Sequence, residues 1–165
     1  MFSGLPGTGK SALATGLGRA LSIPVLTKDI IEAALWRNGI GRDQRSGWIA
    51  YELLTALAES QLALSSSAIL DCVSTTRRLR EGWQELAARH GAVFRAIECV
   101  CSDEQVHRSR LAGRSRNIPG WYELSWEDVE QVRRDYEPWT TERLVLDAVR
   151  PPTESLRAAM DYVSG

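Results

Sequence analysis

The fold is decided by the stretch Gly4-Leu5-Pro6-Gly7-Thr8-Gly9-Lys10-Ser11. It satisfies the pattern G-x-x-x-x-G-K-[ST] in full, and it lies between a short apolar stub and an amphipathic stretch. Glycines let such a loop curl until successive backbone N–H groups point inward, and the following helix adds the positive end of its dipole. The stretch therefore predicts a phosphate-binding loop between a first strand at 1–3 and a helix that ends near Leu21.

Two side chains at the end of this phosphate loop (Gly4–Ser11) carry specific chemistry. The Lys10 ammonium can reach the β- and γ-phosphate oxygens, and the Ser11 hydroxyl is placed to ligate Mg²⁺. We therefore expect the whole loop to bind ATP with Mg²⁺ as its cofactors. The alternative is a glycine-rich turn that matches by chance, and the strand–loop–helix setting argues against it.

The rest of the chain alternates short apolar runs with helix-length amphipathic stretches. This alternation predicts an α/β fold with a parallel sheet. We expect strands at 24–26, 68–71, 93–100 and 144–147, and helices at 30–36, 48–64, 77–90, 102–113, 125–136 and 153–163. Ser102, with Gln105 three residues on, and Ser125 are expected to cap the helices that they begin. No repeat or linker divides residues 1–165, so we expect one doubly wound domain.

Composition limits the partners. The net charge is −1 and the pI about 6.1, so no overall field attracts nucleic acid or an anionic membrane. No apolar run approaches the roughly 20 residues that span a bilayer, and the N-terminus lacks the features of a signal peptide. Cys72, Cys99 and Cys101 lie in apolar stretches without ligand spacing, which favours buried thiols over a metal site. We expect a cytoplasmic protein without a membrane partner, with nucleic acid unlikely as a partner and the oligomeric state open.

Two acidic residues fall at the ends of predicted strands, where ligands bind in open α/β sheets. Asp71 follows the apolar run Ala68-Ile69-Leu70, as the acidic residue of a Walker B strand does, and would hold Mg²⁺ directly or through water. It could instead cap the next turn. Asp29 is a candidate general base that accepts a proton from a substrate hydroxyl, or an N-cap for the helix that follows it. One carboxylate can serve both purposes.

An arginine-rich segment follows the fourth predicted strand and leads into a loop, a candidate lid at about 110–124. Arg110 and Arg114 lie four residues apart, so they share a helix face if the helix extends that far. On a closing lid, both guanidinium groups would clamp the transferring phosphoryl group; the alternative is a solvated basic face. No choice is made for Arg108 and Arg116, and His107 is expected at the surface.

Together, these residues resemble the small P-loop kinases of the AAA-type predicted kinase group. Relatives in that group are the polynucleotide 5′-hydroxyl kinase domain, chloramphenicol phosphotransferase, zeta toxins and gluconate kinase. The resemblance covers nearly the whole chain and rests on the segments SGLPGTGKS, IPVLTKDIIEAAL, AILDCVSTTRRLR, ECVCSDEQVHRSRLAGR and RLVLDAV.

The resemblance implies a three-layer P-loop NTPase fold, with a five-stranded parallel sheet of order 2-3-1-4-5 and helices on both faces. It also implies a general base at Asp29, Mg²⁺ coordination at Ser11 and lid arginines at Arg110 and Arg114. An adenine pocket is implied near the turn after Asp147, with Arg150 close by. The 5′-hydroxyl kinases usually carry an arginine just after the base, whereas Ile30 and Ile31 stand here. This departure argues against a nucleic-acid acceptor.

The combined interpretation is an ATP-dependent phosphotransferase that moves the γ-phosphoryl group to a hydroxyl of a small molecule. Residues 30–65 would form the substrate side. The alternative from another class is a nucleotide-binding switch or slow ATPase without an acceptor. A toxin-like or antibiotic-modifying kinase would differ only in substrate. The chain leaves no room for the helical lid domain of an AAA+ motor.

Overall fold

A computed structural model describes all residues, 1–165, and contains one five-stranded sheet. Its order is β2-β3-β1-β4-β5, and every neighbouring pair is parallel. The strands are β1 (Phe2–Ser3), β2 (Val25–Thr27), β3 (Ile69–Asp71), β4 (Ile97–Val100) and β5 (Leu144–Asp147). The predicted α/β class and strand order are confirmed.

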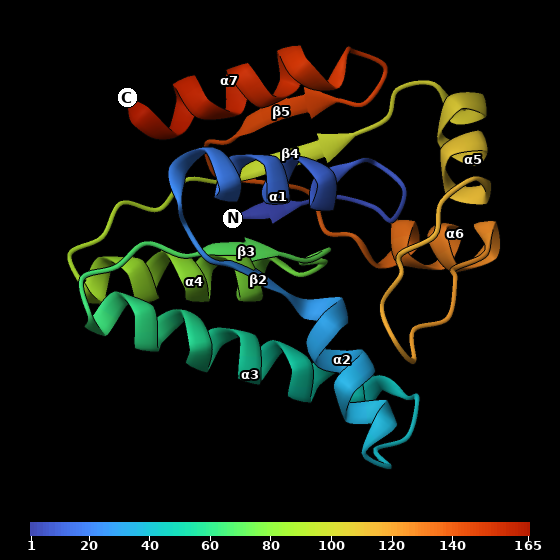
Figure 1. The fold of residues 1–165 in the computed structure, drawn as a ribbon, viewed down its shortest axis with the longest axis horizontal. Helices are drawn as coiled ribbons and strands as arrows, with labels where there is room; N and C mark the ends of the chain where they lie inside the picture. The colour runs from blue at the N-terminus through green and yellow to red at the C-terminus, as the bar shows by residue number, and fades with distance from the viewer.

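Helices cover both faces of the sheet and its carboxyl edge (Figure 1). α1 (Lys10–Leu21) and α7 (Pro152–Ser164) pack together on one face, whereas α3 (Gln44–Ala63) and α4 (Arg77–Arg89) cover the other. α5 (Glu104–Ala112) and α6 (Trp126–Asp135) stand beyond the carboxyl ends of the strands, and α2 (Lys28–Arg37) packs on α3. None of these helices has the length and apolar character needed to cross a membrane.

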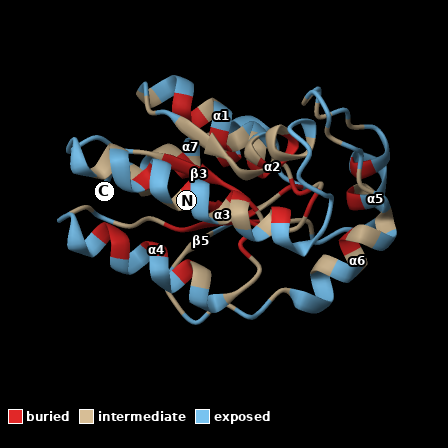
Figure 2. Cartoon of the chain, turned by 90° about the horizontal axis from the view of Figure 1, so that it is seen from below, coloured by how far each residue is buried: buried red, intermediate tan, exposed pale blue.

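The core consists of two apolar clusters, one on each face of the sheet. Phe2, Leu17 and Ile97 belong to the cluster under α1 and α7. Leu70 and Trp83 belong to the cluster under α3 and α4. Figure 2 shows the buried residues in the middle of the molecule and on the inward sides of the helices. Burying both faces of a parallel sheet explains why its strands are apolar runs without alternation.

Several element boundaries differ from the predicted ones. β4 begins at Ile97 instead of residue 93, because its pairing with both β1 and β5 begins at Ile97, and Val93 is exposed. α3 begins at Gln44 instead of Trp48, since the Asp43 carboxylate accepts a hydrogen bond from the Ser46 N–H, 3.1 Å away. Hydrogen bonding at the helix end therefore extends α3 beyond the apolar pattern.

One of the two predicted caps is wrong. The N-cap of α5 is Asp103, whose Oδ1 accepts from the Val106 N–H at 2.9 Å. Ser102 lies one residue too early, and its own N–H donates to Asp147 Oδ1 at 3.1 Å. The Ser125 cap of α6 is confirmed, as part of a capping box with Asp128.

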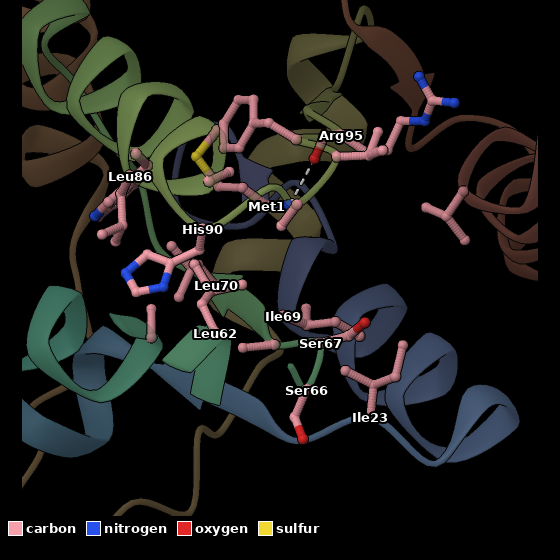
Figure 3. A pocket seen from close by; sticks show the side chains of 18 of the residues that line it. Met1, Ile23, Leu62, Ser66, Ser67, Ile69, Leu70, Leu86, His90 and Arg95 are labelled. Carbon is pink, nitrogen blue, oxygen red and sulfur yellow. Dashed lines mark hydrogen bonds between the residues drawn. The ribbon is translucent and has the colours of Figure 1, made fainter. Parts of the chain in front are cut away.

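An apolar cavity of about 730 Å³ lies at the amino ends of the strands. Figure 3 shows side chains around it, among them Leu62 of α3, Leu86 of α4, and Ile23 from the segment between α1 and β2. The Met1 amino group donates a hydrogen bond of 2.7 Å to the Arg95 carbonyl there. Because ligands of open α/β sheets bind beyond the carboxyl ends of the strands, this cavity is distinct from the predicted phosphate site.

Candidate phosphate-binding site

The phosphate loop connects β1 to α1 at the carboxyl edge of the sheet. Gly4 has φ +131°, and a Cβ there would lie 2.1 Å from the Cys99 carbonyl oxygen of β4, so only glycine fits. Inside the loop, the buried Thr8 hydroxyl donates to the Leu5 carbonyl at 2.8 Å. No side chain caps α1, which leaves its first N–H groups available to an anion. The loop therefore has the shape and dipole of a phosphate site.

Lys10 and Asp71 are both buried, and their opposite charges interact. Burial lowers the pKa of Lys10, while the charges of Asp71 and Asp29 oppose that shift. Burial raises the pKa of Asp71, while the Lys10 charge and the Ser11 hydroxyl oppose it. The only hydrogen bond of the Lys10 ammonium is a long one, 3.4 Å, to the Leu5 carbonyl. The ammonium is therefore free to engage a further anion.

One oxygen of the buried Asp71 carboxylate has no hydrogen-bond partner. Asp71 is 2% exposed at the end of β3, and its Oδ1 has no hydrogen-bond partner. Buried carboxylate oxygens are normally satisfied, and a magnesium ion accepts oxygen ligands of this kind. The residues predicted to hold Mg²⁺, Ser11 and Asp71, thus fit a metal ion chemically.

Asp29 lies inside the first turn of α2, not at its cap. The helix begins at Lys28 with Thr27 as N-cap, so the alternative interpretation of Asp29 as an N-cap is wrong. The short strand β2 ends at Thr27, two residues before Asp29. Asp29 Oδ2 forms an ion pair of 3.0 Å with Arg116 Nη2, and both side chains are largely buried. Its carboxylate therefore faces the phosphate loop, where Arg116 also binds.

Arg116 is the functional candidate that sequence reasoning did not select. Its Nη1 donates to the Ser11 hydroxyl at 2.7 Å, and its Nη2 pairs with Asp29, so one guanidinium spans two predicted site residues. Selection by helical spacing could not find it, because α5 ends at Ala112. Arg114 and Arg116 stand two residues apart in the irregular segment after α5, and that spacing places side chains on one side where a chain is extended. That spacing was the available signal.

The two predicted lid arginines differ in their surroundings. Because α5 ends at Ala112, Arg110 and Arg114 do not share a helix face, and that premise is wrong. Arg114 is largely buried, with its Nε 3.7 Å from Glu123 Oε2. Burial and the charge of Arg116 lower the pKa of Arg114. Arg110 is exposed in the last turn of α5 and makes no ion pair, so its expected role stays a prediction.

His107 is not a surface residue; that expectation is wrong. It is 2% exposed, and its Nε2 lies 2.7 Å from the Pro6 carbonyl oxygen of the phosphate loop. The ring of Trp126 meets it edge-on, with centroids 5.0 Å apart. Burial lowers the pKa of His107, which favours the neutral ring. A neutral imidazole that donates from Nε2 braces the tip of the loop from outside.

Comparison with known proteins places the chain in a family. A family model described as an AAA domain matches residues 1–139. The chain belongs to this AAA domain family. No curated protein matches the chain.

Solved structures share the fold of this AAA domain chain over almost its whole length. A sugar kinase from Janibacter sp. HTCC2649 has a TM-score of 0.74 at 17% identity, covering 99% of this chain and 92% of that one. A gluconokinase from Sinorhizobium meliloti 1021 has a TM-score of 0.73 at 16% identity, with coverage of 99% and 89%. The APS kinase of Mycobacterium tuberculosis, in complex with AMPPNP and APS, has a TM-score of 0.67 at 19% identity, with coverage of 99% and 95%. The predicted resemblance to P-loop kinases is confirmed for family and fold.

The predicted adenine side of the AAA domain lies where β4 and β5 end. Asp147 Oδ1 accepts from the N–H groups of Ser102 and Val149, at 3.1 and 3.2 Å, and so ties the two strand ends together. Arg150 is exposed in the turn just beyond β5. Its predicted contact with the nucleotide stays a prediction.

Proposed function

We propose that this AAA domain chain is a kinase that transfers the γ-phosphoryl group of Mg-ATP to a hydroxyl group of a small molecule. One observation carries the proposal: Lys10, Ser11, Asp71 and Asp29 lie close enough at the end of the phosphate loop for their charges and polar groups to interact, and Arg116 contacts both Ser11 and Asp29. The unpartnered Asp71 oxygen adds a ready ligand for the metal ion. A cytoplasmic location, where ATP is available, is part of the same proposal.

Each residue has a proposed role in the transfer. The acceptor oxygen bonds to the γ-phosphorus while the bond from that phosphorus to the β-phosphate oxygen breaks, and ADP leaves. Asp29 orients the acceptor hydroxyl and takes its proton. Lys10, with Arg114 and the predicted Arg110, offsets the negative charge on the transferring group. Ser11 and Asp71 would hold Mg²⁺, which supplies charge neutralisation at the β- and γ-phosphates.

Several facts support a small molecule as the acceptor. The structural neighbours include a sugar kinase, a gluconokinase and an APS kinase. The net charge of −1 gives no field for nucleic acid. Ile30, which follows Asp29, is 53% exposed and provides no cation for a phosphodiester. The acceptor would lie between α2, α3 and the segment that carries Arg114 and Arg116.

The proposal is tested by screening hydroxyl metabolites, nucleosides, sugars, and aminoglycoside or chloramphenicol-type drugs for ADP release. An acceptor should raise the rate above the background hydrolysis of ATP. Asp29→Asn should bind Mg-ATP as the wild type does but lose transfer, because the amide cannot take a proton. Transfer at the wild-type rate in the Asp29→Asn protein would remove that residue from the mechanism.

A second candidate is a nucleotide-binding switch or slow ATPase. It is favoured by the contacts of Arg116, which engages both Ser11 and Asp29 and so makes this segment sensitive to what occupies the loop. The same screen separates the two functions. If no hydroxyl compound raises turnover while Mg-ATP binds, the switch becomes the better account.

A further inference from the structure

The lid expected at 110–124 is the loop between α5 and α6, residues 113–125, called the lid loop below. Its tip lies against the far end of α2. The rings of Trp36 and Trp121 stack with centroids 5.0 Å apart and planes at 20°. Tyr122 adds a second ring, 5.6 Å from Trp36. Aromatic pairs at these distances attract beyond simple burial of area.

Two arginines extend this aromatic contact to the backbone of the tip. Arg37 Nη1 donates to the Pro119 carbonyl. The Arg42 guanidinium lies 5.2 Å from the Trp36 ring centroid and 5.7 Å from that of Tyr122, as a cation over two π-faces. The fit is close: Gly120 has φ +80°, and a Cβ there would lie 2.8 Å from the Arg37 Cγ. The tip is therefore docked by specific contacts.

The other half of the lid loop turns its arginines inward. Glu123 accepts from the Arg116 N–H at 2.7 Å, and its second oxygen lies 3.7 Å from Arg114 Nε. These contacts fold the loop back on itself. The Arg116 side chain, 11% exposed, then reaches Ser11 and Asp29.

A single helix connects the two ends of this arrangement. α2 carries Asp29 in its first turn and Trp36 and Arg37 in its last. Ten helical residues span roughly 15 Å, so the helix acts as a rigid spacer between the partner of Arg116 and the dock of the tip. α2 therefore fixes the distance between the residues that dock the tip and the carboxylate that Arg116 contacts.

We propose that Trp36, Arg37 and Arg42 are positioning residues, which dock the lid loop on α2 and thereby hold Arg116 over Ser11 and Asp29 before any nucleotide binds. Arg116 is then the cation that a metal-bearing nucleotide replaces at Ser11, while the docked tip keeps the guanidinium beside the transfer site. The consequence for catalysis rests on the proposed kinase function. The docking itself does not.

Docking is tested by limited trypsin digestion of the full chain without nucleotide, because Arg114 and Arg116 are themselves cleavage sites. In Trp121→Ala and Arg37→Ala, cleavage after these arginines should be about tenfold faster or more, since local opening costs less. Arg45→Ala is the matched control: Arg45 is exposed and makes no ion pair. Fragment masses identify the cut. Equal rates in wild type, Trp121→Ala and Arg37→Ala would overturn the proposal.

A conservative variant separates docking from general destabilisation. Trp121→Phe keeps an aromatic face and should be cleaved by trypsin at a rate within about threefold of wild type. Trp121→Leu, whose side chain is only slightly smaller than that of phenylalanine but has no ring, should be cleaved faster. Thermal unfolding of each variant identifies any that fails to fold. Leucine protecting as well as phenylalanine would mean that simple filling of space, not ring stacking, holds the tip.

Kinetics tests the catalytic consequence once an acceptor is known. Trp121→Ala should lower kcat about tenfold or more while KM for ATP stays within about threefold, because the phosphate loop is untouched. Unchanged kcat together with fast cleavage would confine the dock to a structural role and overturn its positioning role. If Trp121 protects the lid loop from trypsin but no hydroxyl compound accepts phosphate, the proposed docking is supported and only the proposed kinase function is contradicted.

Discussion

The phosphate loop and the lid loop approach the same site by different physical means. The phosphate loop depends mostly on local features: the backbone conformation of Gly4, the Thr8–Leu5 hydrogen bond and the uncapped start of α1 lie within residues 4–11. The lid loop reaches the site through Arg116, which is held in place by contacts between segments about 80 residues apart in sequence, such as that of Arg37 with Pro119. A site formed by backbone groups can be predicted from a short sequence motif, whereas a site formed by side chains from distant segments depends on tertiary contacts. Four predictions test this contrast.

The largest effect is expected in the phosphate loop. Lys10→Ala should reduce ATP turnover at least about a hundredfold, because a buried cation that neutralises developing charge is lost. Turnover in steady-state ADP release is the measurement. Turnover within about threefold of wild type would show that the loop does not engage the reacting phosphates.

The next effect compares two arginines. Arg116→Ala should lower turnover by about tenfold to a hundredfold, because its guanidinium contacts Ser11 and Asp29. Arg110→Ala should change turnover less, since Arg110 is exposed without an ion pair. Parallel ADP-release assays give the ratio. A larger loss of turnover in Arg110→Ala than in Arg116→Ala would favour Arg110, which helical spacing predicts, and would contradict the role assigned to Arg116 from its contacts.

A brace outside the loop should have a smaller effect. His107→Ala leaves the Pro6 carbonyl without its partner and opens a void, so the free energy of unfolding should fall by about 1–3 kcal/mol. Chemical denaturation measures this change. Arg45→Ala, at an exposed residue that makes no ion pair, is the control, and its free energy of unfolding should fall by less than about 0.5 kcal/mol. Equal losses in both variants would rule out a bracing role.

The smallest effect is a shift with pH. Burial raises the pKa of Asp71, so its carboxyl group takes up a proton at a higher pH than an ordinary aspartate does. Because a metal ligand must be ionised, affinity for Mg-ADP should fall as the pH is lowered, and the fall should begin at higher pH than usual. Titration calorimetry between pH 8 and pH 5 measures it. Asp71→Asn should flatten the profile; an unchanged slope in that variant would assign the titration to another group.

Much of the fold follows from sequence because its determinants are local. The phosphate loop motif and the apolar strands predict the sheet, and Lys10, Ser11, Asp29 and Asp71 lie at its carboxyl edge as expected. The predicted helix boundaries differ from the structure where a capping hydrogen bond decides them: at α5, Asp103 and not Ser102 accepts that bond.

What the sequence could not predict depends on distant partners. His107 looks like a polar surface residue until the fold brings it to Pro6, 101 positions away. Arg116 has no helical spacing to mark it, and its contact with Ser11 spans 105 positions. Tertiary packing selects these two residues, through the contact of α5 with the phosphate loop for His107 and through the lid loop for Arg116; propensity and periodicity do not.

The central claim is that the phosphate loop holds a nucleoside triphosphate together with its metal ion. Titration calorimetry of ATP into the full chain tests it most directly, with and without Mg²⁺ and in parallel with Lys10→Ala. We predict binding at one site, weakened when Mg²⁺ is omitted and lost in Lys10→Ala. Absence of binding heat from ATP and GTP in the folded wild-type protein, or the same isotherm in Lys10→Ala, would contradict it.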